Sequence, residues 1–272
     1  MGKAPASAAD GAAWFGAPVR RLVPLDPEGA LAEIAGLAGA AGEGGLPRLA
    51  ALLSTPGPLR DFLAAAFDLS FFLRDCARRR PEMLERLFDE PLERRLDALI
   101  AEIRQVPGGA DVNEQTLMAA LRRLKTEAHF LIALADLAGA GRAGPTVRRL
   151  SRLAETCIGA SVDFLLRDAD RQGKLRLPDP ERPAEGSGWI LLGMGKLGAS
   201  ELNFSSDIDL VVFFDPHAPA VVDPLEAGDL FARMTRRLVR ILQDRTGDGY
   251  VFRTDLRLRP DPGSTPLAIS VA

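Results

Sequence analysis

The chain has 272 residues, of which 47 % are hydrophobic, and it carries a formal net charge of −3. This length and composition are typical of one or two globular domains and exclude an intrinsically disordered chain. The small net charge excludes a general electrostatic attraction to nucleic acid or to anionic membranes. No apolar run approaches the roughly 18 residues of a membrane-spanning helix, and the N-terminus lacks a secretory signal pattern. We therefore expect a cytoplasmic protein with neither nucleic acid nor membrane as a partner.

Composition divides the chain into four predicted regions. Residues 1–25 are rich in Ala, Gly and Pro and predict a flexible N-terminal arm. Residues 26–170 show apolar positions at helical spacing in one segment after another, which predicts a helical domain. Across residues 171–188, Gly and Pro alternate with charged residues, so this stretch is predicted to be a linker. Residues 189–272 then form a second domain.

Local signals predict where individual helices and strands lie. Residues 59–79 keep one continuous helical pattern. Asp111 and Glu114 have the spacing of a capping box and predict the start of a long helix. Asp223 precedes a proline, as an N-cap residue precedes the first position of a helix. Residues 250–258 alternate between polar and apolar side chains and therefore predict a strand.

Residues 189–215 are the most informative stretch. An apolar run leads into a glycine-rich turn, and a second apolar run follows Asp207-Ile208-Asp209. The stretch therefore predicts a strand, a loop and a second strand. Because side chains two apart on a strand point the same way, Asp207 and Asp209 share one face. Two adjacent carboxylates repel each other, and a divalent metal ion would relieve that repulsion by using both as ligands.

A third acid and several basic residues extend this pattern. On the later predicted strand, Asp255 shares a face with Arg253, Arg257 and Arg259. Nucleotidyl transfer needs the charge of the phosphate to be neutralised, and two Mg²⁺ ions held by three carboxylates do this. Backbone N–H groups of a glycine-rich turn can hold phosphate oxygens. Lys196, together with one of the three arginines, would balance the remaining charge, and the sequence leaves open which arginine does so.

Neither part of the pattern is specific by itself. Glycine turns between strands are common, and this one lacks the spacing of a Walker A loop. An Asp-x-Asp pair often caps a loop. The combination is more specific, because Gly195-Lys196, ten residues, Asp-x-Asp and a later Asp follow one another in order. This order resembles the polymerase-beta-like superfamily of nucleotidyltransferases. The resemblance implies an α+β fold, in which a helical domain precedes a catalytic domain with a mixed sheet backed by helices.

Two longer motifs carry a closer resemblance. Residues 193–210 (GMGKLGASELNFSSDIDL) and 255–268 (DLRLRPDPGSTPLA) resemble the glutamine synthetase adenylyltransferase/adenylyl-removing family. Residues 121–139 resemble the helical region that precedes the catalytic domain in that family. Ala199 and Thr265 stand where the family often has glycine. The family carries two such domains in tandem. The residues of the first motif and the preceding helical region indicate the N-terminal, adenylyl-removing half. We expect the catalytic domain in this chain to be incomplete at its C-terminal end.

The resemblance implies an activity and its components. Inorganic phosphate would remove AMP from a tyrosine of adenylylated glutamine synthetase and release ADP, while the parent protein would also adenylylate the synthetase with ATP. Asp207, Asp209 and Asp255 would hold Mg²⁺, as two ions. The residues that would bind the nucleotide or phosphate are Gly193, Gly195, Lys196, Ser205, Ser206 and Arg257. The implied partners are glutamine synthetase and a PII-type nitrogen signalling protein.

Two other readings of the residues stay open. The same site could catalyse a different metal-dependent transfer, such as adenylylation from ATP. Alternatively, the helical region could dock a partner protein while the site itself is inactive.

Overall fold

The structure is a computed structural model that describes the chain apart from residues 1–5, 110, 140–142, 260 and 262. It is a mixed α+β structure in which a helical N-terminal part precedes a small mixed sheet, and this confirms the predicted fold class at that level. The chain forms two compact units: unit 1 is Met1–Leu99 with Thr126–Thr146, and unit 2 is Ile100–Lys125 with Val147–Ala272. Residues that precede the predicted boundary at 170 thus belong to the same unit as the sheet.

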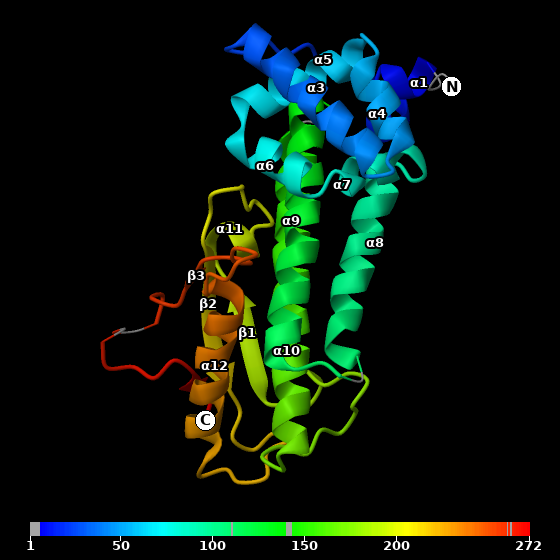
Figure 1. Ribbon diagram of the computed structural model, residues 1–272. Helices are drawn as coiled ribbons and strands as arrows, with labels where there is room; N and C mark the ends of the chain where they lie inside the picture. The colour runs from blue at the N-terminus through cyan, green and yellow to red at the C-terminus, as the bar shows by residue number, and fades with distance from the viewer. Residues whose placement is uncertain (1–5, 110, 140–142, 260, 262) are drawn as a thin grey trace. The chain divides into compact units, whose positions relative to one another are not determined.

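Helices make up the regular structure described before the sheet (Figure 1). In chain order they are α1 (Ala6–Ala9), α2 (Ala12–Phe15), α3 (Pro27–Glu43), α4 (Pro47–Ser54), α5 (Pro58–Leu69), α6 (Phe71–Arg79), α7 (Glu82–Glu85), α8 (Leu92–Gln105), α9 (Glu114–Ala138) and α10 (Ala143–Arg171). Proline is the first residue of α3, α4 and α5, a position that requires no intrahelical N–H bond. The helix predicted over residues 59–79 is broken at Ser70, whose hydroxyl accepts a hydrogen bond from the Leu73 N–H at 3.3 Å.

The described part of the predicted flexible arm is ordered in unit 1. Trp14, in α2, is fully buried, and its ring meets that of Phe88 edge-on at 5.2 Å. The Leu25 N–H donates to the carboxylate of Asp68. A buried indole thus packs the described part of the predicted arm, although its small residues gave no sign of packing. The first five residues of the predicted arm lie outside the described residues.

Unit 1 also buries a carboxylate. Glu127, in α9, has a side chain that is 1 % exposed. Three arginines pair with it: Arg95 at 2.7 Å, Arg80 at 2.9 Å and Arg86 at 3.2 Å. A buried charge is tolerated when it is paired and hydrogen-bonded, and removal of one partner leaves the others uncompensated. Glu127 thus holds together arginines from several segments of this unit.

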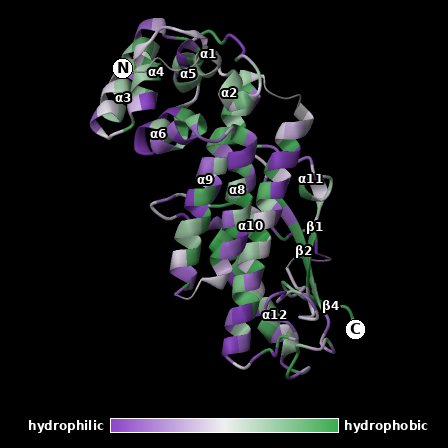
Figure 2. Cartoon of the chain, turned by 90° about the vertical axis from the view of Figure 1, so that its right-hand side faces the viewer, coloured by the Kyte–Doolittle hydropathy of each residue, from purple (hydrophilic) through white to green (hydrophobic). Residues whose placement is uncertain are grey.

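In unit 2, a four-stranded mixed sheet is covered by helices. Its elements are β1 (Trp189–Gly193), α11 (Gly195–Gly198), β2 (Ile208–Phe214), α12 (Ala227–Gln243), β3 (Thr254–Asp255) and β4 (Ile269–Ser270). β1 runs antiparallel to β2, whereas β3 and β4 run parallel to it. Phe231 of α12 packs on Trp189 and Phe214, with ring centroids 6.4 and 5.5 Å away. β1 and β2 are largely apolar in Figure 2. None of the described helices combines the length and apolar composition that a bilayer crossing requires.

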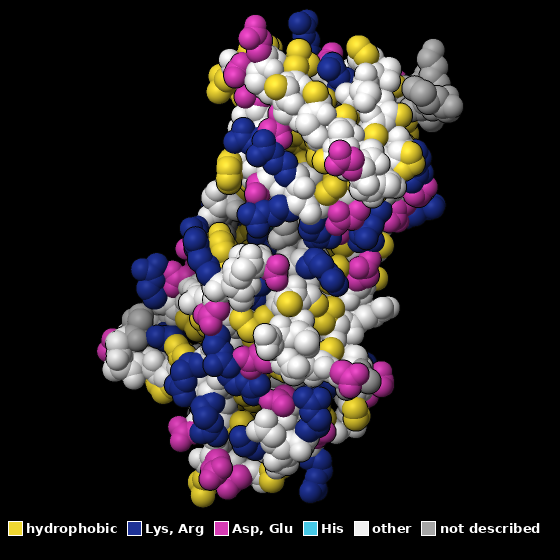
Figure 3. All heavy atoms as spheres, in the orientation of Figure 1, with side chains coloured by type: hydrophobic (Ala, Val, Ile, Leu, Met, Phe, Trp, Pro, Cys, Tyr) yellow, Lys and Arg dark blue, Asp and Glu magenta, His cyan; other side chains and the backbone are white. Residues whose placement is uncertain are grey.

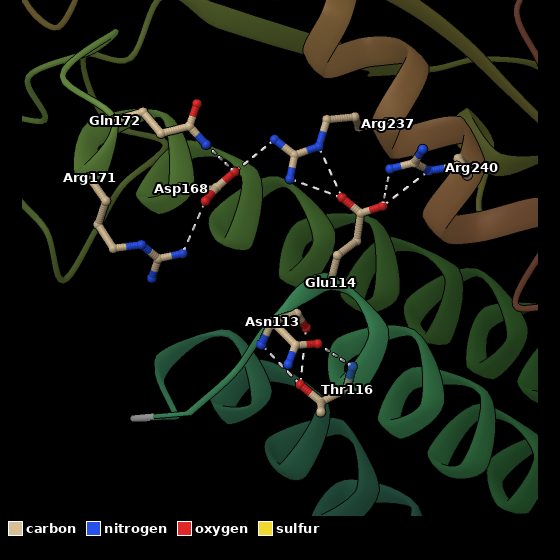
Figure 4. A network of polar contacts seen from close by, with 8 residues as sticks. All are labelled: Asn113, Glu114, Thr116, Asp168, Arg171, Gln172, Arg237 and Arg240. Atoms are coloured by element: carbon tan, nitrogen blue, oxygen red, sulfur yellow. Dashed lines mark hydrogen bonds and ion pairs between the residues drawn. The ribbon is translucent and has the colours of Figure 1, made fainter.

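Polar contacts at the helix ends differ from the predicted caps. The N-cap of α9 is Asn113, which exchanges hydrogen bonds of 3.0 Å with Thr116, and so the predicted capping box is wrong. Glu114 instead binds two arginines of α12, Arg237 and Arg240, and Arg237 also pairs with Asp168 of α10 at 2.7 Å (Figure 4). This network fixes α12 to the helices that cover the sheet. α12 itself begins at Ala227, later than predicted. Asp223, the predicted N-cap, instead forms a local turn with Leu225.

We predict that Glu127→Gln destabilises unit 1 by about 3 kcal/mol, because it leaves three arginines without their shared charge. Urea-induced unfolding of the purified protein measures this loss. The matched control is Arg79→Gln, since Arg79 pairs with Asp75 at 2.9 Å but is 70 % exposed. The control should cost less than about 1 kcal/mol. Equal effects of the two substitutions would contradict the role assigned to Glu127.

Candidate active site

A glycine-rich turn joins β1 to β2 and lies directly against a carboxylate. The Met194 N–H donates to the carbonyl oxygen of Asp209 at 2.8 Å. Gly195 follows with a left-handed φ of 51°, and a Cβ there would lie 2.8 Å from Asp209 Oδ2. At Gly198, a Cβ would lie 2.5 Å from the carbonyl oxygen of Gly193. Glycine is required at both positions because the backbone approaches its neighbours too closely for a side chain.

Lys196 lies in the short helix α11 that follows this turn, and its side chain is exposed. Its carbonyl oxygen accepts a hydrogen bond from the Glu201 N–H at 2.8 Å. The preceding residue, Ser200, has a left-handed φ of 57°. The chain therefore turns sharply after α11, and this turn leaves the ammonium group of Lys196 accessible beside the glycines.

Asn203 organises the loop between α11 and β2. Its Oδ1 accepts hydrogen bonds from the Ser205 N–H at 3.2 Å and from the Ser206 hydroxyl at 2.8 Å. On the other side of the loop, the Leu202 N–H donates to Ser151 Oγ of α10 at 3.0 Å. Ser205 and Ser206, which were predicted to bind nucleotide or phosphate, are thus held just before β2. The bond to Ser151 fixes the loop to α10.

Strand pairing brings two of the three predicted carboxylates together. Asp209 and Asp255 are register partners in the parallel pair of β2 and β3. Register partners project to the same face of a sheet, so these side chains are neighbours. β3 is only two residues long, shorter than the predicted strand over residues 250–258. It ends because the Asp255 carboxylate accepts the Arg257 N–H at 2.8 Å and turns the backbone away.

Arginines pair with two of the three predicted carboxylates, Asp207 and Asp255. Arg253 donates to the carboxylate of Asp207 and, at 2.8 Å, to the carbonyl oxygen of Ser205. Arg257 donates from Nε to Asp255 Oδ2 at 2.9 Å. Hydrogen bonding from Arg257 holds the pKa of the Asp255 carboxyl below its ordinary value. Arg253 and Arg257, predicted to share a face with Asp255, thus bind different acids.

This arrangement determines how the carboxylates fit a metal ion. Within the described ranges, no group of three or more His, Cys, Asp or Glu side chains is arranged to hold one. Three carboxylates suit a hard cation such as Mg²⁺ by their chemistry, and the carboxylate of Asp209 accepts no hydrogen bond from the described residues. Asp207 and Asp255 are occupied by arginines. The three residues therefore fit the ion by type, but the strand register brings only Asp209 and Asp255 together, and guanidinium groups pair with Asp207 and Asp255.

A buried arginine positions β3 and gave no signal in the sequence. Arg122 of α9 is fully buried and donates to the carbonyl oxygens of Asp244, Gly249 and Met118. Burial lowers the pKa of its guanidinium, and the nearby acids offset part of that effect. The bonds to Asp244 and Gly249 fix the end of α12 and the turn that leads to β3. The helical pattern of α9 could not reveal this, because a carbonyl partner far along the chain leaves no trace in periodicity.

A glycine-rich turn, paired carboxylates and arginines together have the residue chemistry that binding of phosphate groups requires. Residues 61–272 match the family described as glutamate-ammonia ligase adenylyltransferase. The chain belongs to this family of nucleotidyltransferases, which confirms the family resemblance in the sequence.

Relatives with the name bifunctional glutamine synthetase adenylyltransferase/adenylyl-removing enzyme are similar to most of the chain. That of Mesorhizobium japonicum is 66 % identical over 258 residues, which cover 95 % of this chain and 26 % of the relative. That of Brucella suis is 56 % identical over 92 % of this chain and 25 % of the relative. That of Rhizobium meliloti is 52 % identical over 84 % of this chain and 23 % of the relative. The chain thus spans about a quarter of the length of the curated relatives it matches.

We predict a graded loss of stability when methyl groups are added to the turn. Gly195→Ala should cost about 1 kcal/mol, because its φ is left-handed and Asp209 must turn aside. Gly198→Ala should cost more, about 2 kcal/mol, because the backbone carbonyl of Gly193 must move. Gly247→Ala is the control, since a Cβ there would meet no described atom within 4 Å. Urea-induced unfolding measures all three, and equal values would contradict the close packing of the turn.

We also predict that Arg257→Gln raises the pKa of Asp255 toward its ordinary value, because the lost guanidinium stabilised the charged carboxylate. NMR titration of the labelled carboxyl carbon measures this shift. The pKa in the folded protein is depressed, so the pair contributes stability above the unfolded-state pKa. That contribution is lost as pH falls through the folded-state pKa. Arg233→Gln is the control, because it removes an exposed charge that does not pair with Asp255. An equal shift of the Asp255 pKa in that variant would contradict a specific Arg257–Asp255 pair.

Proposed function

We propose that unit 2 is a nucleotidyl-transfer domain of the polymerase-beta-like type and that this chain represents the adenylyl-removing half of a protein that regulates glutamine synthetase. The observation that carries the proposal is the β2–β3 register, which pairs Asp209 with Asp255 beside the Gly195 turn. The names of the relatives support glutamine synthetase as the substrate. The helical region directly before the sheet supports the adenylyl-removing half.

The proposed reaction is a phosphorolysis. An oxygen of inorganic phosphate attacks the phosphorus of the AMP group, and a new P–O bond forms. The bond between that phosphorus and the tyrosine oxygen breaks, and the phenolate leaves with the electron pair. The phenolate then takes up a proton to regenerate tyrosine. The products are ADP and unmodified glutamine synthetase, so no oxidant or reductant is needed.

Side chains of this chain would supply the charge balance. Asp207, Asp209 and Asp255 would hold Mg²⁺, which would neutralise the transferred phosphate. Arg253 and Arg257 occupy two of these carboxylates, so they would move aside and become available to the phosphate oxygens. The backbone at the Gly195 turn would bind phosphate oxygens through N–H groups.

The remaining candidate residues would surround the same phosphate groups. Lys196 is exposed beside the glycines and would contribute a positive charge. Ser205 and Ser206, held by Asn203 at the start of β2, would contribute hydrogen bonds. A PII-type signalling protein remains part of the proposal as a further partner, on the family resemblance alone.

We predict that Asp209→Asn slows ADP release from adenylylated glutamine synthetase by at least about 100-fold, because it removes a charge that the transition state requires. The assay follows ADP formation with phosphate and Mg²⁺ present. Asp223→Asn is the matched control, because Asp223 caps a local turn at Leu225 and is exposed. The control should keep the activity of the unaltered protein.

Two outcomes would contradict the proposal. If Asp209→Asn retained activity within about threefold, the carboxylate pair would not be the site. If the protein labelled glutamine synthetase from ATP with no dependence on phosphate, the chain would represent the adenylylating activity instead.

A further inference from the structure

A groove of about 450 Å³ lies between α10 and β1, and all of its lining residues belong to unit 2. α10 lies beside β1 in both Figure 1 and Figure 2. Large apolar side chains form much of the wall of this groove: Ile158 and Val162 of α10, Trp189 and Leu191 of β1, and Leu197 of α11. The groove therefore follows the edge of the sheet that β1 forms.

The backbone of β1 has unused hydrogen-bonding groups at this edge. Among the described strands, β1 pairs only with β2. The Met194 N–H donates to the carbonyl oxygen of Asp209, and hydrogen-bonded pairs alternate along an antiparallel ladder, so the backbone groups of Trp189 and Leu191 point away from β2. The Trp189 N–H donates to Ser187 Oγ at 3.1 Å. The N–H and C=O of Leu191 have no hydrogen-bond partner among the described residues.

This edge also lacks the usual protection against pairing with another strand. Native edge strands are commonly shielded by charged side chains, by proline or by a bulge. Residues 189–193 contain neither a charged residue nor proline. On the face of β1 that points away from α10, Ile190 and Leu192 are 40 % and 45 % exposed. An added strand would bond to the backbone of Leu191 and cover apolar side chains on both faces.

The groove is acidic. Glu155 and Asp163 line it, and none of the described residues that line it is basic. Neither carboxylate forms a hydrogen bond or an ion pair with the described residues. Arg104 and Arg152 lie in a separate hollow that the two acids also border, and they pair with neither acid. On the face that Figure 3 shows, Lys and Arg side chains gather over α12 and β3, and neither element lines the groove.

The environment of Asp163 supports the lack of a cation in the groove. Burial raises the pKa of its carboxyl, and attraction to Arg167 offsets only part of that effect. The Arg167 guanidinium instead donates to the carbonyl oxygen of Pro180, at 3.2 Å. A cation inserted into the groove would therefore meet carboxylates that lack a direct partner.

We propose that the edge of β1 and the groove beside it bind an extended segment of a partner protein, in which an arginine or lysine lies among apolar residues. The segment would add a strand to the sheet, with its apolar side chains in the groove and its cation against Asp163 and Glu155. Pairing of β1 with a second copy of itself fits less well, because residues 185–193 contain no basic residue. This docking surface does not depend on the proposed reaction.

Binding of a labelled synthetic peptide, followed by fluorescence polarisation, tests the surface. The peptide has about eight residues, with valine and threonine in alternation and one central valine replaced by arginine. A matched peptide carries glutamate at that position. We expect the arginine peptide to bind about tenfold more tightly, because only its charge complements the groove.

Variants of the protein locate the binding. Asp163→Asn should weaken binding of the arginine peptide about fivefold, through loss of one partly exposed ion pair. Asp229→Asn is the matched control, since Asp229 is exposed in the first turn of α12 and does not line the groove. Equal effects of the two substitutions would overturn the proposal, because the peptide would then respond to surface charge in general.

N-methylated peptides test the strand pairing itself. Methyl groups on alternate residues block one edge of an extended peptide and leave its other edge free. One set of methyl groups should abolish binding, and the complementary set should leave it intact. Equal effects of the two sets would overturn the pairing with β1.

Two further results would overturn the proposal. One is failure of the arginine peptide to bind at millimolar concentration, or binding no tighter than that of the glutamate peptide. The other comes from sedimentation of the protein alone, which we expect to show a monomer. A dimer that the arginine peptide dissociates would assign the edge of β1 to a second copy of the chain.

Discussion

The candidate site depends on the parallel pairing of β2 with β3, a contact only two residues long. Asp209 faces Asp255 only in this register, and a shift of one residue would turn Asp255 to the opposite face of the sheet. So short a strand cannot fix its own register. The register is fixed from outside. Arg122 binds the turn before β3, and the carbonyl oxygen of Leu242 accepts the N–H groups of Val251 and Phe252 at 2.9 and 3.0 Å.

Two arginines compensate part of the negative charge of the site when no ion is bound. Carboxylates brought together by strand pairing repel one another, and Arg253 and Arg257 compensate two of them. These arginines are exposed, so the pairs contribute little to stability. Their effect is on ligands: a cation must displace a guanidinium to bind, and an anion that attracts the guanidinium makes that displacement easier. Cation and anion binding are therefore expected to favour each other.

The two motifs in the sequence were enough to predict the family, the α+β class and a strand–turn–strand unit with Asp207 and Asp209 at the start of its second strand. Glycines in that turn were recognisable because close approach of backbone leaves no other residue type possible. Contacts between segments far apart in the chain were not predictable. Arg122 binds backbone carbonyls more than a hundred residues away, and the anchoring role of Trp14 depends on Phe88. Helical periodicity carries no record of such partners, and the short β3 arises from a local turn at Asp255.

The position of α12 between β2 and β3 has a consequence for how the protein folds. The antiparallel pair of β1 and β2 is local in sequence, and it can form as soon as the loop of residues 194–207 closes. β3 pairs with β2 only after the whole intervening helix has docked, and contacts of such long sequence separation form late because loop closure precedes any gain from pairing. During folding, the glycine turn therefore exists before the carboxylate pair does. Asp255 joins Asp209 only in this later step, so repulsion between these two carboxylates does not oppose the earlier pairing of β1 with β2.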